Sequence, residues 1–284
     1  MRLGDCCKTN LHTYSDKEKW SLIRYLDTGS ITEGRIDEIQ TLYPGVDKIP
    51  SRARRKASFG DILFSTVRPN QKHYGIIEAG TENLLVSTGF TVVTVDTTIA
   101  DPYFIYYYLT QSSVIESLQA IAEQSTSTYP SIKPSDIEDI ELDLPELETQ
   151  KKIGSTLRML DRKIALNEEI NDNLEQQAQS YFQELFVDNA SPEWTTGTIS
   201  DLGTVVGGST PSKAKPEYYT ESGIAWITPK DLSINKSKFV SHGENDITEL
   251  GLRNSSASLM PEGTVLFSSR APIGYIAIAA GEVT

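Results

Sequence analysis

Clustered basic side chains are the groups in this sequence whose types and spacing could do chemistry. Most of them precede a short apolar run, and one follows it: Arg52, Arg54, Arg55, Lys56 and Lys72. Clusters of arginine and lysine bind phosphate groups, and affinity for nucleic acid comes from the local cluster rather than from the total charge. The cluster therefore predicts contacts with a DNA backbone, although a solvated positive surface would have the same composition.

A short motif occurs twice, once in each half of the chain. Residues 60–69 read GDILFSTVRP and residues 263–272 read GTVLFSSRAP. Each copy has a turn glycine, an apolar strand, small hydroxyl residues and an arginine close to a proline. A repeated module is typical of a protein that contacts two places on one extended partner. We therefore expect Arg68 and Arg270 to lie at a DNA surface; the alternative for both is an internal ion pair.

The second half of the chain adds basic residues in sequence that is typical of loops. Residues 207–213 read GGSTPSK and end at Lys213, and Lys230 follows a proline further along. Glycine lets a backbone approach a ligand closely. The sequence therefore predicts that this glycine-rich loop and Lys230 approach the DNA backbone.

The sequence contains no recognisable set of catalytic residues. It has no Gly-x-Gly-x-x-Gly loop, no phosphate-binding Gly-Lys-Ser/Thr motif and no Asn/Asp-Pro-Pro-aromatic signature of adenine methyltransferases. Its histidines and cysteines do not have the spacing of a zinc site: His12, His73, His242, Cys6 and Cys7. An acidic run over residues 136–143 could suggest a metal-dependent nuclease, but we interpret it as the solvated face of a strand. We predict no enzyme activity, no metal and no cofactor.

Composition favours a two-domain protein of ordinary globular type. The chain has 284 residues, of which 38% are hydrophobic and 23% are charged. It lacks both a membrane-spanning run of roughly 20 apolar residues and an apolar signal region at its start. Its two cysteines are adjacent, which favours reduced thiols, so we expect a cytoplasmic protein. The formal net charge of −13 predicts weak DNA binding by this chain alone, with partner proteins supplying positive surface.

Strand and helix patterns are mixed in the first half. Strands are predicted over residues 59–67, 73–78 and 90–96. Asp101 and Pro102 are a typical N-cap and first helical residue, and they predict a helix to about residue 122. The aromatic residues of this helix could stack on bases, but a core-facing surface is the favoured interpretation.

Two further strands are predicted near the boundaries of the halves. Residues 137–144 alternate in polarity and are expected to form a closing strand. Residues 202–206 are expected to form a strand that enters the glycine-rich loop. A linker over residues 187–192 separates the two halves.

A long helix without proline is predicted over residues 146–186. Its apolar positions alternate four and three apart, as in a coiled coil that needs a helical partner. We define this set as the seam: Ile153, Leu157, Leu160, Ile164, Asn167, Asn171, Leu174, Ala178, Tyr181 and Leu185. The asparagines are expected to fix the register of pairing. Roughly 40 residues at about 1.5 Å each give a rod of about 60 Å, although a two-helix hairpin core would fit the same periodicity.

Together these stretches resemble the specificity subunits of type I restriction–modification enzymes. The resemblance rests on the glycine-rich loop, on both copies of the motif, on residues 223–232 (GIAWITPKDL), and on residues 143–145 followed by 150–153. It implies an α+β fold: a target-recognition domain of mixed strands and helices, then a long coiled-coil helix, then a partial second recognition domain. The corresponding segments are residues 1–145, 146–187 and 192–284. Compared with the family, the second domain is cut short and a second long helix is absent.

The resemblance also implies a DNA-recognition subunit without catalytic activity. Such subunits read the two halves of a bipartite DNA site with two recognition domains, and their helices set the distance between the halves. Modification subunits dock on the helices and methylate adenine, and a restriction subunit translocates and cleaves DNA. The expected partners are double-stranded DNA and these subunits.

Other interpretations stay open. The seam lacks the helix that usually covers it, so it could pair with a second copy of the chain. The chain could also be a coiled-coil scaffold that binds proteins, or a truncated recombination cassette without activity of its own.

Overall fold

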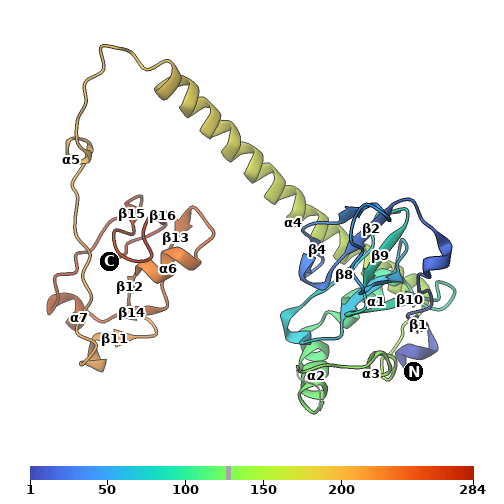
Figure 1. Cartoon of the computed structure of the whole chain (residues 1–284). Coiled ribbons are helices and arrows are strands. Elements are labelled where there is room, and N and C mark those ends of the chain that lie inside the picture. The colour runs from blue at the N-terminus through green and yellow to red at the C-terminus, as the bar shows by residue number, and fades with distance from the viewer. Residues whose placement is uncertain (126–128) are drawn as a thin grey trace. The chain divides into compact units, whose positions relative to one another are not determined.

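Two compact units make up residues 1–125 and 129–284, the part of the chain that the computed structural model describes. They span Met1–Asp188 and Asn189–Thr284 (Figure 1). Both units mix strands with helices, and the first unit ends in a long helix. The predicted α+β class and the long helix are therefore confirmed.

The first unit is built on two four-stranded sheets. One is antiparallel, in the order β1-β10-β7-β8, and consists of β1 (Cys7–Thr9), β10 (Phe90–Val95), β7 (Ile62–Ser65) and β8 (Tyr74–Ile76). The other has the order β5-β2-β9-β6 and consists of β5 (Gln40–Leu42), β2 (Ile23–Leu26), β9 (Leu84–Ser87) and β6 (Ala53–Lys56). A small hairpin joins β3 (Ile31–Thr32) to β4 (Arg35–Ile36). The three strands predicted between residues 59 and 96 are confirmed as β7, β8 and β10.

Strand β7 explains why the first copy of the motif is apolar throughout. Ile62 and Phe64 belong to a core that includes residues of helices α1 (Pro102–Leu109) and α2 (Ser112–Glu123). Leu63 belongs instead to a core that includes residues of the second sheet. A strand that is buried on both faces has a continuous apolar run rather than an alternating one.

The helix predicted to begin at Asp101 is two helices. The Asp101 cap is confirmed, because its Oδ1 accepts a hydrogen bond from the Phe104 amide at 2.9 Å. Helix α1 ends at Leu109, and Gln111 adopts an extended conformation before α2 begins. The break allows Leu109 and Leu118 to enter one core. Aromatic residues of α1 lie in this core or pack against it, as the core-facing interpretation predicted.

The strand predicted over residues 137–144 is wrong. The segment begins inside helix α3 (Pro134–Glu138), where Pro134 occupies the first turn and the Lys133 amide donates to Asp136 Oδ2 at 2.6 Å. This proline and the cap favour a helical turn over an extended strand. The rest of the segment makes one isolated bridge, between Glu141 and Arg2. The acidic run is therefore not the face of a strand.

Helix α4 (Leu147–Phe182) continues as a π-helical turn, Gln183–Asp188. Its 36 residues span about 54 Å, and Figure 1 shows the helix extending away from the sheets of the first unit. Leu157 is half-buried, and the other residues of the seam are exposed. The helix is therefore a projecting rod rather than part of the core, and it presents its apolar positions to solvent.

The first turns of α4 are fixed to the start of α1. The Gln150 side chain is 1% exposed; its Oε1 accepts from the Asp101 amide at 3.0 Å, and its Nε2 donates to the Ile99 and Pro145 carbonyls. One turn later the helices approach so closely that a Cβ on Gly154 would lie 2.5 Å from Asp101 Oδ1. Only glycine fits this contact without a shift of one of the helices.

Polar pairs continue the attachment of α4 to the first unit. Arg158 Nε of the helix pairs with Glu78 Oε1 at 2.8 Å, and Glu168 Oε2 pairs with Arg35 Nη2 at 2.8 Å. Between them, Asp161 Oδ2 accepts a hydrogen bond from Tyr107 Oη at 2.6 Å. Arg158 also lies over the ring of Tyr103, 4.2 Å from its centroid. About the first half of the rod is therefore held in a fixed direction.

The second unit has two three-stranded sheets. One has the order β11-β14-β12 and the other β13-β16-β15; the strands are β11 (Tyr219–Thr220), β12 (Ile224–Trp226), β13 (Phe239–Val240), β14 (Asn245–Ile247), β15 (Val265–Phe267) and β16 (Ile276–Ala279). The helices are α5 (Ile199–Leu202), α6 (Pro229–Ile234) and α7 (Glu249–Arg253). The strand predicted over residues 202–206 is wrong: Thr198 and Asp201 form a capping box that starts α5, and the following residues make no strand.

The two copies of the motif form hairpins with the same register. In the first, Gly60 donates to the Ile77 carbonyl and Ser65 to the His73 carbonyl, at 2.9 Å each. In the second, Gly263 donates to the Ala279 carbonyl at 2.9 Å and Ser268 to the Tyr275 carbonyl at 3.0 Å. Both turn glycines have positive φ, 87° and 85°. The sequence repeat is therefore a structural repeat.

The surroundings of the two hairpins differ. Strand β7 lies between β8 and β10, and Phe64 is 1% exposed; β15 is at the edge of its sheet, and the equivalent Phe267 is 58% exposed. The same strand is thus internal in the first unit and peripheral in the second.

Replacing Gly154 with alanine tests the contact between α1 and α4. The added methyl group would overlap the Asp101 carboxylate, and overpacking of this kind costs about 1–3 kcal/mol. We expect faster hydrogen exchange in residues 147–158 of Gly154→Ala, measured by mass spectrometry on the full chain. Ser155→Ala, at the exposed neighbouring position, is the matched control and should leave exchange unchanged. Equal exchange in both variants would show that the close approach does not hold the helix.

Candidate nucleic-acid interface

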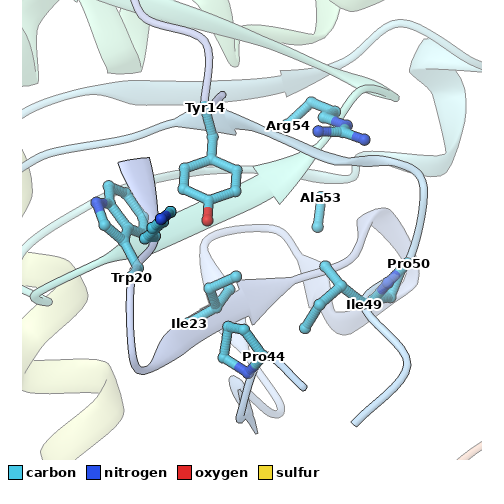
Figure 2. Close-up of a pocket in the computed structure, with 9 residues that line it drawn as sticks. Tyr14, Trp20, Ile23, Pro44, Ile49, Pro50, Ala53 and Arg54 are labelled. Atoms are coloured by element: carbon cyan, nitrogen blue, oxygen red, sulfur yellow. The ribbon is translucent and has the colours of Figure 1, made fainter. Parts of the chain in front are cut away.

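Most of the basic cluster lies in or beside strand β6, which is an edge strand of the second sheet. A β-bulge between Ala53 and Arg55 makes Arg54 an additional residue in the strand, and bulges redirect side chains. Arg54 is half-buried and lines a pocket, and Figure 2 shows it at the rim. Arg52, which precedes the strand, is exposed. These two arginines are the members of the cluster best placed to meet a phosphate.

Arg55 and Lys56, the last two residues of strand β6, form contacts with the N-terminal segment. Arg55 Nη1 donates to Asn10 Oδ1 at 2.7 Å, and burial lowers the pKa of Arg55. Lys56 pairs with Glu18, and the hydrogen bond from Lys56 lowers the pKa of that carboxyl. Lys56 Nζ also lies 5.2 Å from the centroid of the Trp20 ring. Both side chains help to hold the N-terminal segment against β6.

Arg68 ends the first hairpin strand at an exposed loop. Its backbone is left-handed, with φ of 47°, and it precedes the short 3₁₀ helix Pro69–Gln71. Its guanidinium carbon lies 5.0 Å from the centroid of the Tyr129 ring. The side chain is exposed, so Arg68 is not the buried internal ion pair that the alternative interpretation required. A left-handed residue other than glycine is strained, which is consistent with a loop whose shape matters.

Arg270 is exposed in the corresponding loop of the second hairpin. The shared register places it one position before the equivalent of Arg68, because Pro69 and Pro272 lie at the same distance from Ser65 and Ser268. The two loops therefore present their arginines from adjacent, not identical, positions. The sequence motif alone does not reveal this offset.

Lys72 and Lys230 are exposed but form ion pairs. Lys72 Nζ pairs with Glu33, and the carboxylate raises the pKa of Lys72. Lys230 Nζ lies 2.7 Å from Glu244 Oε2, and this contact raises its pKa. Exposed pairs of this kind are worth little in stability. A phosphate can therefore compete for either ammonium group.

In the second unit the glycine-rich loop and Lys230 lie at one pocket. The pocket has a volume of about 310 Å³, and Lys213, Lys230 and Trp226 are among its lining residues. The loop is tied to the sheet by a hydrogen bond from Trp226 Nε1 to the Ser209 carbonyl at 3.2 Å. Pro272, from the second copy of the motif, also lines the pocket. The structure thus brings together three segments that the sequence analysis singled out separately.

Sequence reasoning did not identify Tyr14 and Trp20 as site residues. Both line the pocket beside Arg54, together with Pro44 and Pro50 (Figure 2). Tyr14 and Trp20 belong to one segment near the N-terminus that is distant in the sequence from Arg54, and no motif connects that segment to the basic strand. Only the fold brings them next to the basic strand.

Neither metal chemistry nor membrane insertion is indicated by the described residues. Within residues 1–125 and 129–284, no group of three or more His, Cys, Asp or Glu side chains is placed to hold a metal ion. In the same part of the chain, no helix combines the length and hydropathy required to cross a bilayer.

The sequence was compared with models of known families. The model described as "Type I restriction modification DNA specificity domain" matches residues 10–176 and 192–284, which is most of the chain. The chain belongs to this family. Its members are specificity subunits, so the predictions of a DNA sequence-recognition subunit, and of catalysis in partner subunits rather than in this chain, are confirmed.

Individual relatives agree with the family assignment. The HindI specificity subunit of Haemophilus influenzae is 24% identical over 97% of this chain and 74% of that protein. The MjaIX specificity subunit of Methanocaldococcus jannaschii is 42% identical over 37% of this chain and 24% of that protein. In fold, the chain is similar to the HsdS subunit from Thermoanaerobacter tengcongensis, with a TM-score of 0.50 and 23% identity over the whole of this chain and 71% of that subunit.

We expect neutralisation of Arg52 and Arg54 together to reduce the salt dependence of DNA binding. Each lost phosphate contact lowers the slope of log K against log salt by about 0.9, so the double variant to glutamine should lose up to about two. The measurement is fluorescence anisotropy of labelled DNA with the assembled complex at several salt concentrations. Lys163→Gln, an exposed position on α4, removes charge as a control. Arg55→Gln should instead lower the stability of the fold and leave the slope of log K against log salt unchanged. If the double variant of Arg52 and Arg54 has the wild-type slope, neither arginine contacts a phosphate.

Proposed function

We propose that this specificity subunit reads a bipartite DNA site through two recognition domains held apart by a helical spacer. The first domain is residues 1–145, the spacer is residues 146–187, and the second domain is residues 192–284. The hairpin repeat carries this proposal: the two units share one strand register, and an exposed arginine follows the strand in each. A protein that repeats a binding element on both sides of a rigid rod can engage two places on one duplex.

The residues proposed to contact DNA fall into two sets. In the first domain they are Arg52, Arg54, Arg68 and Lys72, with Arg55 and Lys56 stabilising strand β6 beneath them. In the second domain they are Lys213, Lys230 and Arg270. All of these proposed contact residues except the half-buried Arg54 are exposed, and Lys213 and Lys230 converge on one pocket, which supports this assignment. Phosphate contacts position such a domain, and contacts with base edges give it specificity.

The proposed partners follow from the family and from the charge of the chain. Specificity subunits assemble with modification and restriction subunits and bind DNA. With a formal net charge of −13, this chain has an overall field that repels DNA. We therefore expect strong binding only in the complex with modification subunits, which supply further positive surface.

Replacement of Arg68 tests sequence reading. Arginine can bind guanine in a bidentate manner, whereas lysine is a point charge. We expect Arg68→Ala to abolish or relax methylation at one half of the target, and Arg68→Lys to retain DNA binding while losing selectivity. The measurement is genome-wide mapping of methylated adenine in cells that express the modification and specificity subunits. Lys163→Ala, at an exposed position of α4, is the control. An unchanged methylation map and unchanged affinity in Arg68→Ala would exclude this arginine from DNA recognition.

We further propose that the exposed seam pairs with the seam of a second copy. Its apolar residues are spaced for a coiled coil and are exposed in this chain, and a symmetric pair would place two first domains on a palindromic site. Leu160 and Met159 are adjacent on α4 and are 54% and 63% exposed, but only Leu160 lies on the seam. They therefore form a matched pair for a test.

We expect Leu160→Ser to weaken self-association at least tenfold, because each copy loses a buried leucine worth about 1.5–3 kcal/mol. Met159→Ser should leave association unchanged. Sedimentation equilibrium over a range of concentrations gives both dissociation constants. A monomer at all concentrations, or equal effects of both substitutions, would contradict pairing through the seam.

A further inference from the structure

The pocket beside strand β6 has no role in the functions described so far. It has a volume of about 440 Å³, and its lining includes Tyr14, Lys19, Trp20, Ile23 and Arg54. Figure 2 shows the side chains converging on one hollow within the first unit. A cavity of this size accommodates a small molecule or one nucleotide rather than a helix or a strand.

Tyr14 supplies a polar group that opens into the pocket. The side chain is 7% exposed, and Figure 2 shows its hydroxyl directed into the pocket. The Tyr14 ring contacts the Trp20 ring and belongs to a core that includes Ile23 and Ala53, and within the described residues no hydrogen bond is found for its hydroxyl. The hydroxyl is not among the buried side-chain atoms without a hydrogen-bond partner, so water can reach it, and a ligand that displaces this water must replace its hydrogen bond. A ligand in the pocket would therefore need to offer a donor or acceptor to Tyr14 Oη.

The walls of the pocket suit a flat apolar body. The Trp20 ring is half-buried and lies 4.7 Å from the Tyr14 ring between centroids, at an angle of 48°. Ile23, Pro44 and Ile49 form the other side. Aromatic rings facing aliphatic side chains bind planar heterocycles, and stacking of a nucleobase on such a ring is worth about 1–3 kcal/mol.

Cationic side chains stand around this apolar hollow. Arg54 projects from the bulge of β6, and Lys19 from the loop that follows the 3₁₀ helix Asp16–Glu18. Arg54 also continues the basic surface that begins at Arg52. A ligand with a planar ring, a hydrogen-bonding edge and an anionic group satisfies all of these features.

We propose that this pocket binds a single nucleotide. The base lies against Trp20, one polar atom of its edge bonds to Tyr14 Oη, and the phosphate is bound by Arg54 and Lys19. A base inside a duplex is covered on both faces and cannot enter a concave pocket, so a nucleotide from DNA must first leave the stack. A DNA origin of the nucleotide rests on the proposed function, whereas binding of a free nucleotide does not.

Binding of free nucleotides tests the pocket directly. The probes are the four deoxynucleoside 5′-monophosphates, with deoxyribose 5-phosphate as the probe that lacks a base, and binding to the full chain is followed by saturation-transfer NMR titration. We expect at least one monophosphate to bind at millimolar concentration or better, and deoxyribose 5-phosphate to bind at least tenfold more weakly. Tyr14→Phe keeps the ring and removes the hydroxyl, so it should weaken binding about three- to tenfold. Trp20→Leu and Arg54→Gln should weaken it as well, and Tyr181→Phe on α4 is the control.

Several results of this titration would overturn the proposal. One is equal binding of deoxyribose 5-phosphate, which would mean that only phosphate is recognised. Another is no effect of Tyr14→Phe and Trp20→Leu. A third is binding of an acidic aromatic peptide, such as N-acetyl-Asp-Phe-amide, in preference to every monophosphate, which would assign the pocket to a partner protein.

Duplexes with 2-aminopurine distinguish the source of the nucleotide. Once the target site is mapped, 2-aminopurine is placed at each position in turn and its fluorescence is measured in the assembled complex. An increase at one position that is lost in Trp20→Leu, with the same duplex still bound, supports a nucleotide extruded from DNA. A fluorescence increase that persists in Trp20→Leu means that the base is extruded into a partner subunit instead. If the wild-type pocket nevertheless binds free monophosphates, the pocket is a site for free nucleotides. If the complex binds no duplex, the proposed function fails. The monophosphate titration then still shows whether the pocket binds a nucleotide.

Discussion

The close packing of α4 against α1 at Gly154 is the contact on which the geometry of the first unit depends. Because Gly154 has no side chain, the backbone of α4 reaches the capping residue Asp101, and the buried Gln150 side chain ties the two segments together. A rod attached through one flexible joint could point anywhere. Contacts along about half of its length hold this rod in one direction relative to the sheets of the first unit.

A single hairpin register occurs in both units. The turn glycines and the strand pairing are repeated, and an exposed arginine follows the strand in each unit. The two units differ in what packs against the first strand of the hairpin. In the first unit β10 and the α1–α2 core enclose β7, whereas β15 is an edge strand with exposed apolar side chains.

The basic cluster shows why counting charges does not define an interface. Some of its side chains are used within the fold: Arg55 bonds to Asn10, and Lys56 pairs with Glu18 and lies over Trp20. These contacts fix β6 and build one wall of the pocket. The bulge then separates Arg54 from its neighbours and turns it toward the pocket. An acidic protein can in this way have local positive charge at a few positions of its surface.

The sequence by itself determined the elements whose signals are local. The repeated motif, the Asp101 cap, the three strands between residues 59 and 96 and the long helix all follow from periodicity, capping and turn residues, which act between near neighbours. The strands expected over residues 137–144 and 202–206 failed because a proline and caps favour helical turns there. Only the tertiary structure decided which basic residues have internal partners, which apolar strand is covered and which distant segments enclose the Tyr14 pocket. Those outcomes depend on contacts between residues far apart in the chain, and no local pattern encodes them.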